Sequence, residues 1–140
     1  MSGLKTPIVL MADDDEDDCT LAKDAFEESH VRGSFQCVED GIELLDFLRG
    51  GGEQAAQAGL PALILLDLNM PRKDGRQALR EIKALPSLRN IPIVVLTTSR
   101  EERDIVFSRE MGAESFITKP AVFNEWVEIM KSLGEQWLGD

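Results

Sequence analysis

Several residue types and patterns are scarce in this chain of 140 residues, and each shortage argues against a class of protein. The 15 Lys and Arg residues are outnumbered by 26 Asp and Glu, giving a formal net charge of -11. That balance disfavours nucleic-acid binding, which neutralises phosphates with cations. No apolar run is long enough to span a bilayer, and residues 1–7 contain no signal-peptide core. We therefore expect a cytoplasmic protein that does not bind a membrane.

Histidine and cysteine are also rare. His30 is the only histidine and lies near the end of a helical segment, which leaves little material for a Ser-His-Asp or histidine–metal mechanism. Cys19 and Cys37 lack the spacing of metal ligands, and a cytoplasmic chain would keep them reduced. We expect both to be buried, inert thiols.

What the chain does contain is a series of short apolar runs that end on reactive side chains. These are residues 8–12 before Asp13 and Asp14, 63–66 before Asp67, 93–96 before Thr97, and 114–118 before Lys119. Short runs rich in Leu, Ile and Val, bounded by turn residues, are typical of strands buried on both faces of a parallel sheet. An aspartate at the end of such a strand requires a compensating cation or donor, because burying a lone carboxylate is costly.

Helical periodicity separates the apolar runs. Apolar stripes occur in residues 21–26, 41–48, 75–82 and 123–137, more weakly in 100–111, and residues 35–38 supply a fifth strand. This alternation predicts an α/β protein with a flavodoxin-like, doubly wound sheet of five parallel strands and five helices. The uniform composition predicts a single domain over residues 1–140, with the glycine-rich segment 50–59 as a surface excursion.

The carboxyl ends of parallel strands lie along one edge of a sheet, so the side chains that end the runs should converge. The acidic turn after the first strand would repel the phosphate of a dinucleotide or flavin unless a cation intervened. Mg²⁺ prefers carboxylate oxygens, water and phosphate oxygens. We expect Asp14 and Asp67 to bind it, with Asp13 acting directly or through a water.

The remaining acids of this turn, residues 15–18, are better explained as helix capping and as charge that complements the helix dipole. An EF-hand loop beginning at Asp13 is another metal-binding interpretation. It fails because the sixth position is Asp18, where the turn needs glycine, and the twelfth is Asp24 rather than glutamate.

A cation that bridges Asp14 and Asp67 would leave one Asp67 oxygen free to attack a phosphoryl group and form an aspartyl phosphate. Lys119 would neutralise the phosphoryl oxygens, and the Thr97 hydroxyl would bind one of them. Two alternatives remain. A haloacid-dehalogenase-like phosphatase needs a second aspartate two residues further on, where Asn69 stands. A degenerate binding module would not need so complete a site.

The acidic pair, the Asp-Leu-Asn-Met-Pro segment that begins at Asp67, Thr97 and the Lys119-Pro120 pair stand in the order and approximate spacing of a known family. Along its whole length the chain resembles the receiver domains of two-component response regulators. The resemblance implies a signalling domain rather than an enzyme, phosphorylated by the phosphohistidine of a sensor histidine kinase. It also implies that the backbone carbonyl of Asn69 binds Mg²⁺ and that the Lys119–Pro120 bond is cis. The glycine-rich excursion and the aromatic last helix look most like small stand-alone regulators paired with phytochrome-type kinases.

The same resemblance implies a switch. Thr97 would move toward the phosphoryl group and Phe116 would turn into the space it leaves. The face formed by residues 100–111, 114–118 and the last helix would change shape, while Asn69 and Ser99 would tune the lifetime of the phosphoryl group.

The output of this switch is expected to pass through another protein, because no effector domain follows in the sequence. The candidates are a downstream protein partner, a phosphotransfer protein and a homodimer. Trp137 and Leu138 are candidate interface residues. Phe123, Val127 and Met130 broaden the apolar stripe of the last helix, which favours a dimer.

Overall fold

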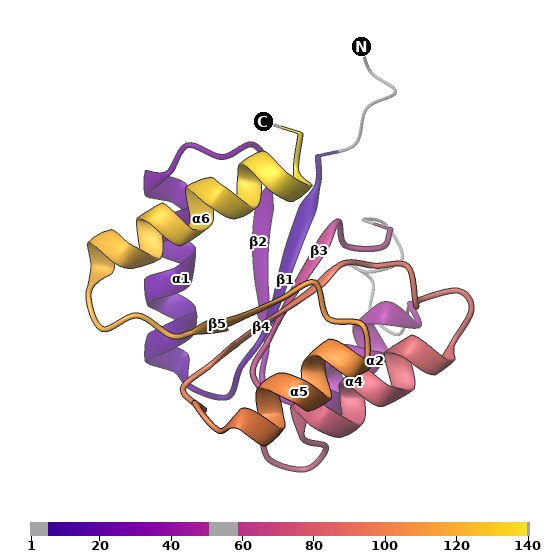
Figure 1. Ribbon diagram of the computed structural model, residues 1–140. Helices are drawn as coiled ribbons and strands as arrows, with labels where there is room; N and C mark the ends of the chain where they lie inside the picture. The colour runs from indigo at the N-terminus through magenta and orange to yellow at the C-terminus, as the bar shows by residue number, and fades with distance from the viewer. Residues whose placement is uncertain (1–5, 51–58, 140) are drawn as a thin grey trace.

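A sheet of five parallel strands forms the centre of the protein, and helices cover both of its faces (Figure 1). The computed structural model describes residues 6–50 and 59–139. The strands are β1 (Ile8–Ala12), β2 (Ser34–Val38), β3 (Leu63–Leu66), β4 (Ile93–Thr97) and β5 (Ser115–Thr118), in the order β2-β1-β3-β4-β5. The helices are α1 (Glu16–Glu28), α2 (Gly41–Leu48), α4 (Gly75–Ala84), α5 (Glu102–Glu110) and α6 (Phe123–Trp137). The predicted flavodoxin-like fold is confirmed. Residues 51–58 of the predicted surface excursion lie outside the described residues.

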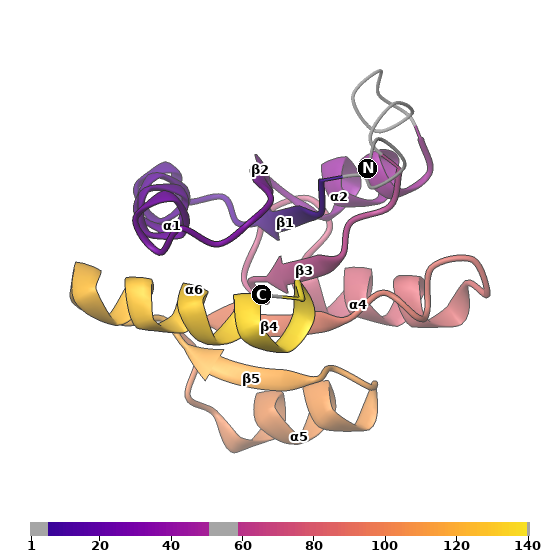
Figure 2. The same cartoon turned by 90° about the horizontal axis from the view of Figure 1, so that it is seen from above.

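The central strands alternate between two apolar cores, as strands buried on both faces must. Val9, Met11 and Leu65 face α1 and α6, whereas Leu10 and Ile64 face α2 and α4. Figure 2 shows α1 and α6 grouped on one side and α2, α4 and α5 on the other. The helices thus cover the faces and leave the carboxyl edge of the sheet open for the site.

Helix α6 buries a wider apolar stripe against the sheet and α1 than the sequence predicted. Trp126 and Leu133 lie in the core, as predicted, but so do Val127, Met130 and Leu138. The proposal that this broad stripe marks an interface is therefore wrong for these three residues, because α1 and the sheet already cover them. On this stripe Phe123 is the exposed apolar residue among the described ones.

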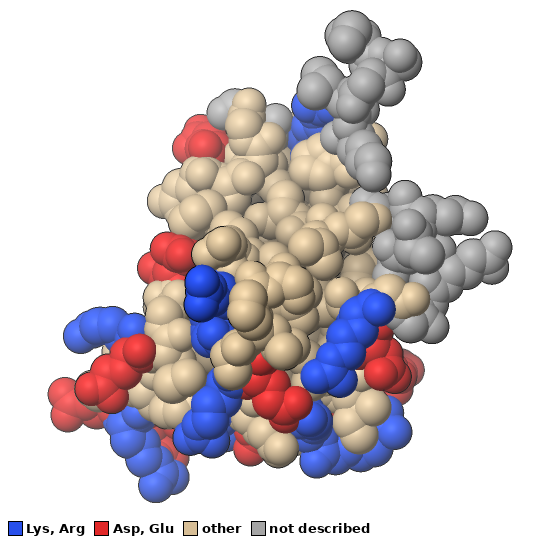
Figure 3. Space-filling model, turned by 90° about the vertical axis from the view of Figure 1, so that its right-hand side faces the viewer, with Lys and Arg blue, Asp and Glu red and all other residues tan. Residues whose placement is uncertain are grey.

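Charged side chains lie outside these cores. On the side of the molecule seen in Figure 3, Lys and Arg side chains lie among Asp and Glu side chains on the lower part of the face. None of the helices within residues 6–50 and 59–139 is both long and apolar enough to cross a membrane.

A disulfide links α1 to the edge strand β2. It joins Cys19 and Cys37, whose Cα atoms are 6.4 Å apart. Cys19 is partly buried and Cys37 is exposed. The prediction of two buried, reduced thiols was wrong, because the helical position of Cys19 and the strand position of Cys37 gave no sign that the fold places them side by side.

Candidate functional site

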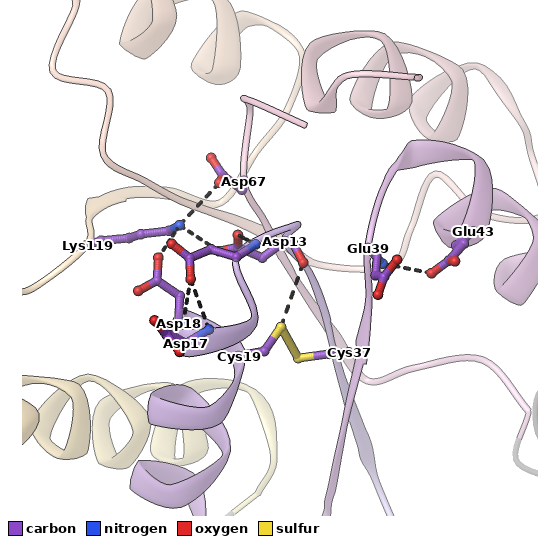
Figure 4. Close-up of a disulfide and its surroundings, with 10 residues drawn as sticks. Asp13, Asp17, Asp18, Cys19, Cys37, Glu39, Glu43, Asp67 and Lys119 are labelled. Atoms are coloured by element: carbon purple, nitrogen blue, oxygen red, sulfur yellow. Dashed lines mark hydrogen bonds and ion pairs between the residues drawn. A yellow bond between two sulfur atoms is a disulfide. The ribbon is translucent and has the colours of Figure 1, made fainter. Parts of the chain in front are cut away.

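The four predicted strand ends converge at the carboxyl edge of the sheet. Asp13 follows β1, Asp67 follows β3, Thr97 ends β4 and Lys119 follows β5. The backbone N–H of Asp67 donates to the carbonyl of Ala12, and that of Lys119 donates to the carbonyl of Thr97, so ladder hydrogen bonds extend to the site residues. Figure 4 shows the side chains of Asp13, Asp67 and Lys119 directed toward one another. Asp67 and Lys119 border an open pocket of about 590 Å³ with a predominantly acidic lining.

Asp67 is nearly buried, and its two carboxylate oxygens have different partners. Oδ1 accepts hydrogen bonds from the Thr97 hydroxyl at 2.7 Å and from the Asn69 backbone N–H at 3.2 Å. Oδ2 lies 3.2 Å from the ammonium of Lys119. One oxygen is therefore fixed by donors while the other faces the cation and the pocket, which is the arrangement required of a carboxylate that reacts at a fixed position.

Lys119 is the counter-ion of the whole cluster. Its Nζ lies 2.6 Å from Asp13 Oδ2 and 2.7 Å from Asp18 Oδ2, in addition to its contact with Asp67. Burial alone would lower the pKa of Lys119, but the contacts with Asp13 and Asp18 outweigh it and raise that pKa above its ordinary value. The lysine therefore stays charged beside these acids.

Asp13 is the least solvated acid of the cluster. Burial raises its pKa from 3.8 to about 6, although its ion pair with Lys119 and a hydrogen bond from the Asp15 N–H act in the opposite direction. Its Oδ2 is enclosed and accepts no hydrogen bond of good geometry, so the ion pair is its only compensation. A buried carboxylate oxygen in this condition requires a cation beside it.

The acids that follow β1 and β3 could bind a divalent metal. One carboxylate oxygen from each of Asp13, Asp14 and Asp67 lies within 4.8 Å of the others. Asp14 is exposed and opens this cluster to solvent, whereas the other two acids are buried. An all-oxygen donor set with a solvent-facing side suits a hard divalent cation that keeps some of its waters.

The remaining predicted residues lie around this centre. Asn69 is exposed beside Asp67, and Ser99 is half-buried, with its N–H 3.4 Å from the Thr97 Oγ1. Phe116 is half-buried on β5 and pairs with Val95 of β4. The predicted cis peptide at Pro120 is wrong: every peptide bond between described residues is trans, the isomer favoured for X–Pro bonds by about 0.5–1 kcal/mol.

Asp18 is a site residue that the sequence did not reveal. The acids of the first turn of α1 were assigned to capping, and for Asp15 this is confirmed, because its side chain accepts from the N–H groups of Asp17 and Asp18. The carboxylate of Asp18, however, reaches Lys119. The two residues are 101 positions apart, and no spacing pattern connects them.

A second polar cluster, which we call the Arg76 clamp, consists of Arg76, Asp104 and Ser99 and joins α4 to α5. Arg76 Nε donates to Asp104 Oδ1 at 2.9 Å and Nη2 donates to Oδ2 at 2.8 Å, while the Ser99 hydroxyl donates to Oδ2 at 2.6 Å. Arg76 Nη1 also lies 3.4 Å from the side-chain oxygen of Asn69. The clamp therefore connects Asn69 and Ser99, the two predicted tuning residues. Its existence could not be inferred from sequence, because Arg76 and Asp104 are 28 positions apart and no spacing pattern connects them.

We expect the clamp to make the stability of the fold depend on pH. The hydrogen bond with Arg76 lowers the pKa of Asp104, and the Ser99 hydroxyl acts in the same direction, although burial opposes them. A folded-state pKa below the unfolded value means that the ionised form stabilises the fold, and this contribution is lost as pH falls through the folded pKa. We expect Asp104→Asn to lower the free energy of unfolding by about 2 kcal/mol at pH 7.

The expected difference in the free energy of unfolding between Asp104→Asn and the native chain narrows once the pH falls below about 5, because Asp104 in the unfolded chain then begins to take up a proton, and it is lost as the pH falls through the lower folded pKa. Denaturant unfolding at several pH values measures it. Asp46→Asn, at an exposed position of α2, is the matched control and should match the native chain at each pH. A difference that stays constant down to pH 3 would show that the charge of Asp104 does not contribute.

Comparison with known proteins shows which family combines this sheet with this site. The sequence matches the response regulator receiver domain over residues 9–131. It is 35% identical over 131 residues to the response regulator Rcp1 of Synechocystis sp., covering 94% of this chain and 88% of that protein.

Solved structures agree with the sequence match. The phosphorylated cyanobacterial phytochrome response regulator RcpA superposes with a TM-score of 0.86 at 41% identity, covering 96% of this chain and 95% of that one. The Mn²⁺-bound form of Rcp1 superposes with a TM-score of 0.83 at 35% identity, covering 94% of each chain. The shared sheet, the match over residues 9–131 and the acidic strand ends lead to one conclusion: this chain belongs to the response regulator receiver domain family.

Proposed function

We propose that this receiver domain accepts a phosphoryl group on Asp67. The observation that carries the proposal is the unequal environment of the two Asp67 oxygens. Thr97 and Asn69 hold Oδ1, while Oδ2 faces Lys119 and the pocket. The carboxylate can thus attack while its orientation is held.

The reaction needs no general base, because the carboxylate of Asp67 reacts in its ionised form. An Asp67 oxygen forms a bond to phosphorus while the bond between phosphorus and the donor's leaving atom breaks, and the leaving group takes that electron pair. Lys119 leaves Asp13 and Asp18 to compensate the charge of the phosphoryl oxygens. The Thr97 hydroxyl, already 2.7 Å from Asp67, transfers its hydrogen bond to one of those oxygens.

Mg²⁺ is the cofactor that we propose for this step. Asp13, Asp14 and Asp67 would hold it, together with the backbone carbonyl of Asn69. The buried carboxylate of Asp13, whose Oδ2 is ion-paired with Lys119 but accepts no hydrogen bond, and the open side at Asp14 support this donor set. When bound, the cation offsets the charge that accumulates between the acids and the incoming phosphoryl group. Mn²⁺, present in the Rcp1 structure, has the same preference for oxygen donors.

The proposed output is a shift between two conformers of the face formed by α5, β5 and α6. Thr97 would draw the loop after β4 toward the phosphoryl group, and Phe116 would turn inward. Asn69 and Ser99, linked through the Arg76 clamp, would set how long the phosphoryl group persists. Helix α5 is suited to such a shift because its buried residues are the polar Asp104 and Ser108 rather than an apolar stripe.

The proposed phosphoryl donor is the phosphohistidine of a sensor histidine kinase. A phytochrome-type kinase is favoured by the similarity to RcpA, a cyanobacterial phytochrome response regulator.

The cytoplasm, where kinases obtain ATP, is the proposed place of action. A downstream protein, a phosphotransfer protein or a second copy of the chain would receive the signal, and the exposed Phe123 is the residue of α6 suited to such a contact. Self-phosphorylation and slow self-dephosphorylation would be the only chemistry of the domain.

Intact-protein mass after incubation with acetyl phosphate tests the proposal. We expect the native chain to gain one phosphoryl group in the presence of Mg²⁺ and none with a chelator. Asp67→Asn should gain none, whereas Asp24→Asn, at an exposed position of α1, should react like the native chain. Uptake by Asp67→Asn, or no uptake by the folded native chain, would contradict the assignment.

A further inference from the structure

The disulfide between Cys19 and Cys37 lies beside the proposed phosphorylation site. Each cysteine is adjacent in sequence to a residue that contacts this site. Cys19 directly follows Asp18, whose carboxylate lies 2.7 Å from Lys119 Nζ. Cys37 directly precedes Val38, whose carbonyl accepts a hydrogen bond from the Asp13 N–H at 2.9 Å. Figure 4 shows the disulfide, Asp13, Asp18 and Lys119 as one group of neighbours.

The two cysteines are suitably placed for reversible chemistry. A Cα separation of 6.4 Å lies within the range that a disulfide bridges without backbone movement. Both cysteines line a groove between α1 and β2, to which Lys23 contributes a positive charge, and Cys37 is exposed. The Cys19 Sγ lies 3.8 Å from the Asp13 carbonyl oxygen, so a thiol at this position would have an acceptor nearby.

We propose that Cys19 and Cys37 form a reversible redox site at which disulfide formation slows phosphorylation of Asp67. The oxidant is a small disulfide that carries carboxylates, which the charge of Lys23 would attract. The inference rests on the proposed function of Asp67. It concerns a separate pair of side chains that takes no part in phosphoryl transfer.

The oxidation proceeds by two exchanges. The exposed Cys37 thiol loses its proton, and its sulfur attacks one sulfur of the small disulfide, releasing one small thiol and leaving a mixed disulfide. The Cys19 thiol then loses its proton and attacks the Cys37 sulfur, which releases the second small thiol. The two cysteines give up two electrons and two protons, and the small disulfide takes up both.

The effect on phosphorylation follows from Asp18. Lys119 has to leave Asp13 and Asp18 before it can compensate a phosphoryl group. The disulfide ties the first turn of α1 to β2 and so retains Asp18 beside Lys119, where its carboxylate competes for the ammonium. Reduction frees that turn to move. Because Asp18 is partly exposed, its competition is worth about threefold in rate, the scale of a partly exposed ion pair.

The test uses the full chain in two states, reduced with dithiothreitol or oxidised with glutathione disulfide, with each reagent removed afterwards. Mass after thiol alkylation establishes the redox state. The rate of phosphoryl uptake from acetyl phosphate with Mg²⁺ is then measured for both forms. We expect an intramolecular disulfide and uptake about threefold slower in the oxidised form.

Two variants test whether the disulfide and Asp18 cause the difference in rate. Cys37→Ser cannot form the disulfide and should react at the same rate after either treatment. Asp18→Asn should still form the disulfide but lose the difference in rate between its two forms. A glutathione adduct that remains on Cys37, equal rates in the two native forms, or faster uptake in the oxidised form would overturn the inference. If neither form takes up a phosphoryl group, the proposed function fails and the inference falls with it, whereas equal uptake overturns the inference alone.

Discussion

Replacing Lys119 with methionine is expected to lower the free energy of unfolding by about 3 kcal/mol at pH 7 in the absence of divalent cations. The side chain is only 7% exposed and is the shared counter-ion of Asp13, Asp18 and Asp67. Methionine keeps the apolar stem and removes the charge, so the variant isolates the loss of the ammonium. The carboxylates that remain would repel one another in a poorly solvated place. Denaturant unfolding measures the change.

Magnesium should restore part of the stability that Lys119→Met loses. A cation that binds only the folded state stabilises it, and its charge replaces part of the missing compensation. Lys131→Met removes an exposed ammonium 3.7 Å from Glu128 and is the matched control, for which a change within about 0.5 kcal/mol is expected. A similar loss in both variants, or a loss at Lys119 that Mg²⁺ does not reduce, would contradict the assignment of this lysine as counter-ion of a metal-binding cluster.

Gly75→Ala is expected to destabilise the fold by about 3 kcal/mol, although helix propensity alone predicts the opposite sign. Gly75 is the first residue of α4 and packs against the backbone of Asp67 and Leu68. An added Cβ would overlap the carbonyl oxygen of Asp67 and come within 2.7 Å of the Cα of Leu68. These are backbone atoms, so the strain can be relieved only by moving backbone, either that of α4 or that of the loop that positions Asp67.

The expected loss at Gly75 has a direct control in the same turn. Gln77 is exposed, and Gln77→Ala changes little more than helix propensity, so its effect should stay within about 0.5 kcal/mol. Thermal and denaturant unfolding of both variants provide the comparison. Gly75→Ala should also slow phosphoryl uptake, because Asp67 shifts with its backbone. A Gly75→Ala chain as stable as the native one would show that α4 can move away from Asp67 at little cost.

The sequence predicted the fold well because the strands are nearly pure apolar runs. Residues of β3 and β4 are buried on both faces, so their composition marks them without any tertiary information. The site was predictable for a related reason. Parallel strands present their carboxyl ends at one edge, so reactive residues at the ends of Ile-, Val- and Leu-rich runs had to approach one another. The contacts of Asp67 with Thr97 and Lys119 confirm this.

Local patterns carried no information about contacts made by helix and loop side chains. The sequence predicts that Asp18 belongs to a capping turn. Only the placement of α1 beside the end of β5 brings its carboxylate to Lys119. The ion pair between Arg76 and Asp104 joins two helices through residues that are 28 positions apart. Neither contact follows from periodicity, because polar residues on amphipathic helices are ordinarily solvated.

The sequence by itself determined the order of elements, the burial of the central strands and the set of acids, hydroxyl and lysine at the sheet edge. Hydrophobic periodicity and the position of a residue at the end of a strand are local properties, so a short stretch of sequence is enough to predict them. Only the tertiary structure decided that Lys119 compensates three acids at once, that Gly75 lies against the backbone of Asp67 and that Cys19 meets Cys37. Those contacts depend on the distance and angle between separate elements, which packing of the two cores sets and no local stretch of sequence encodes.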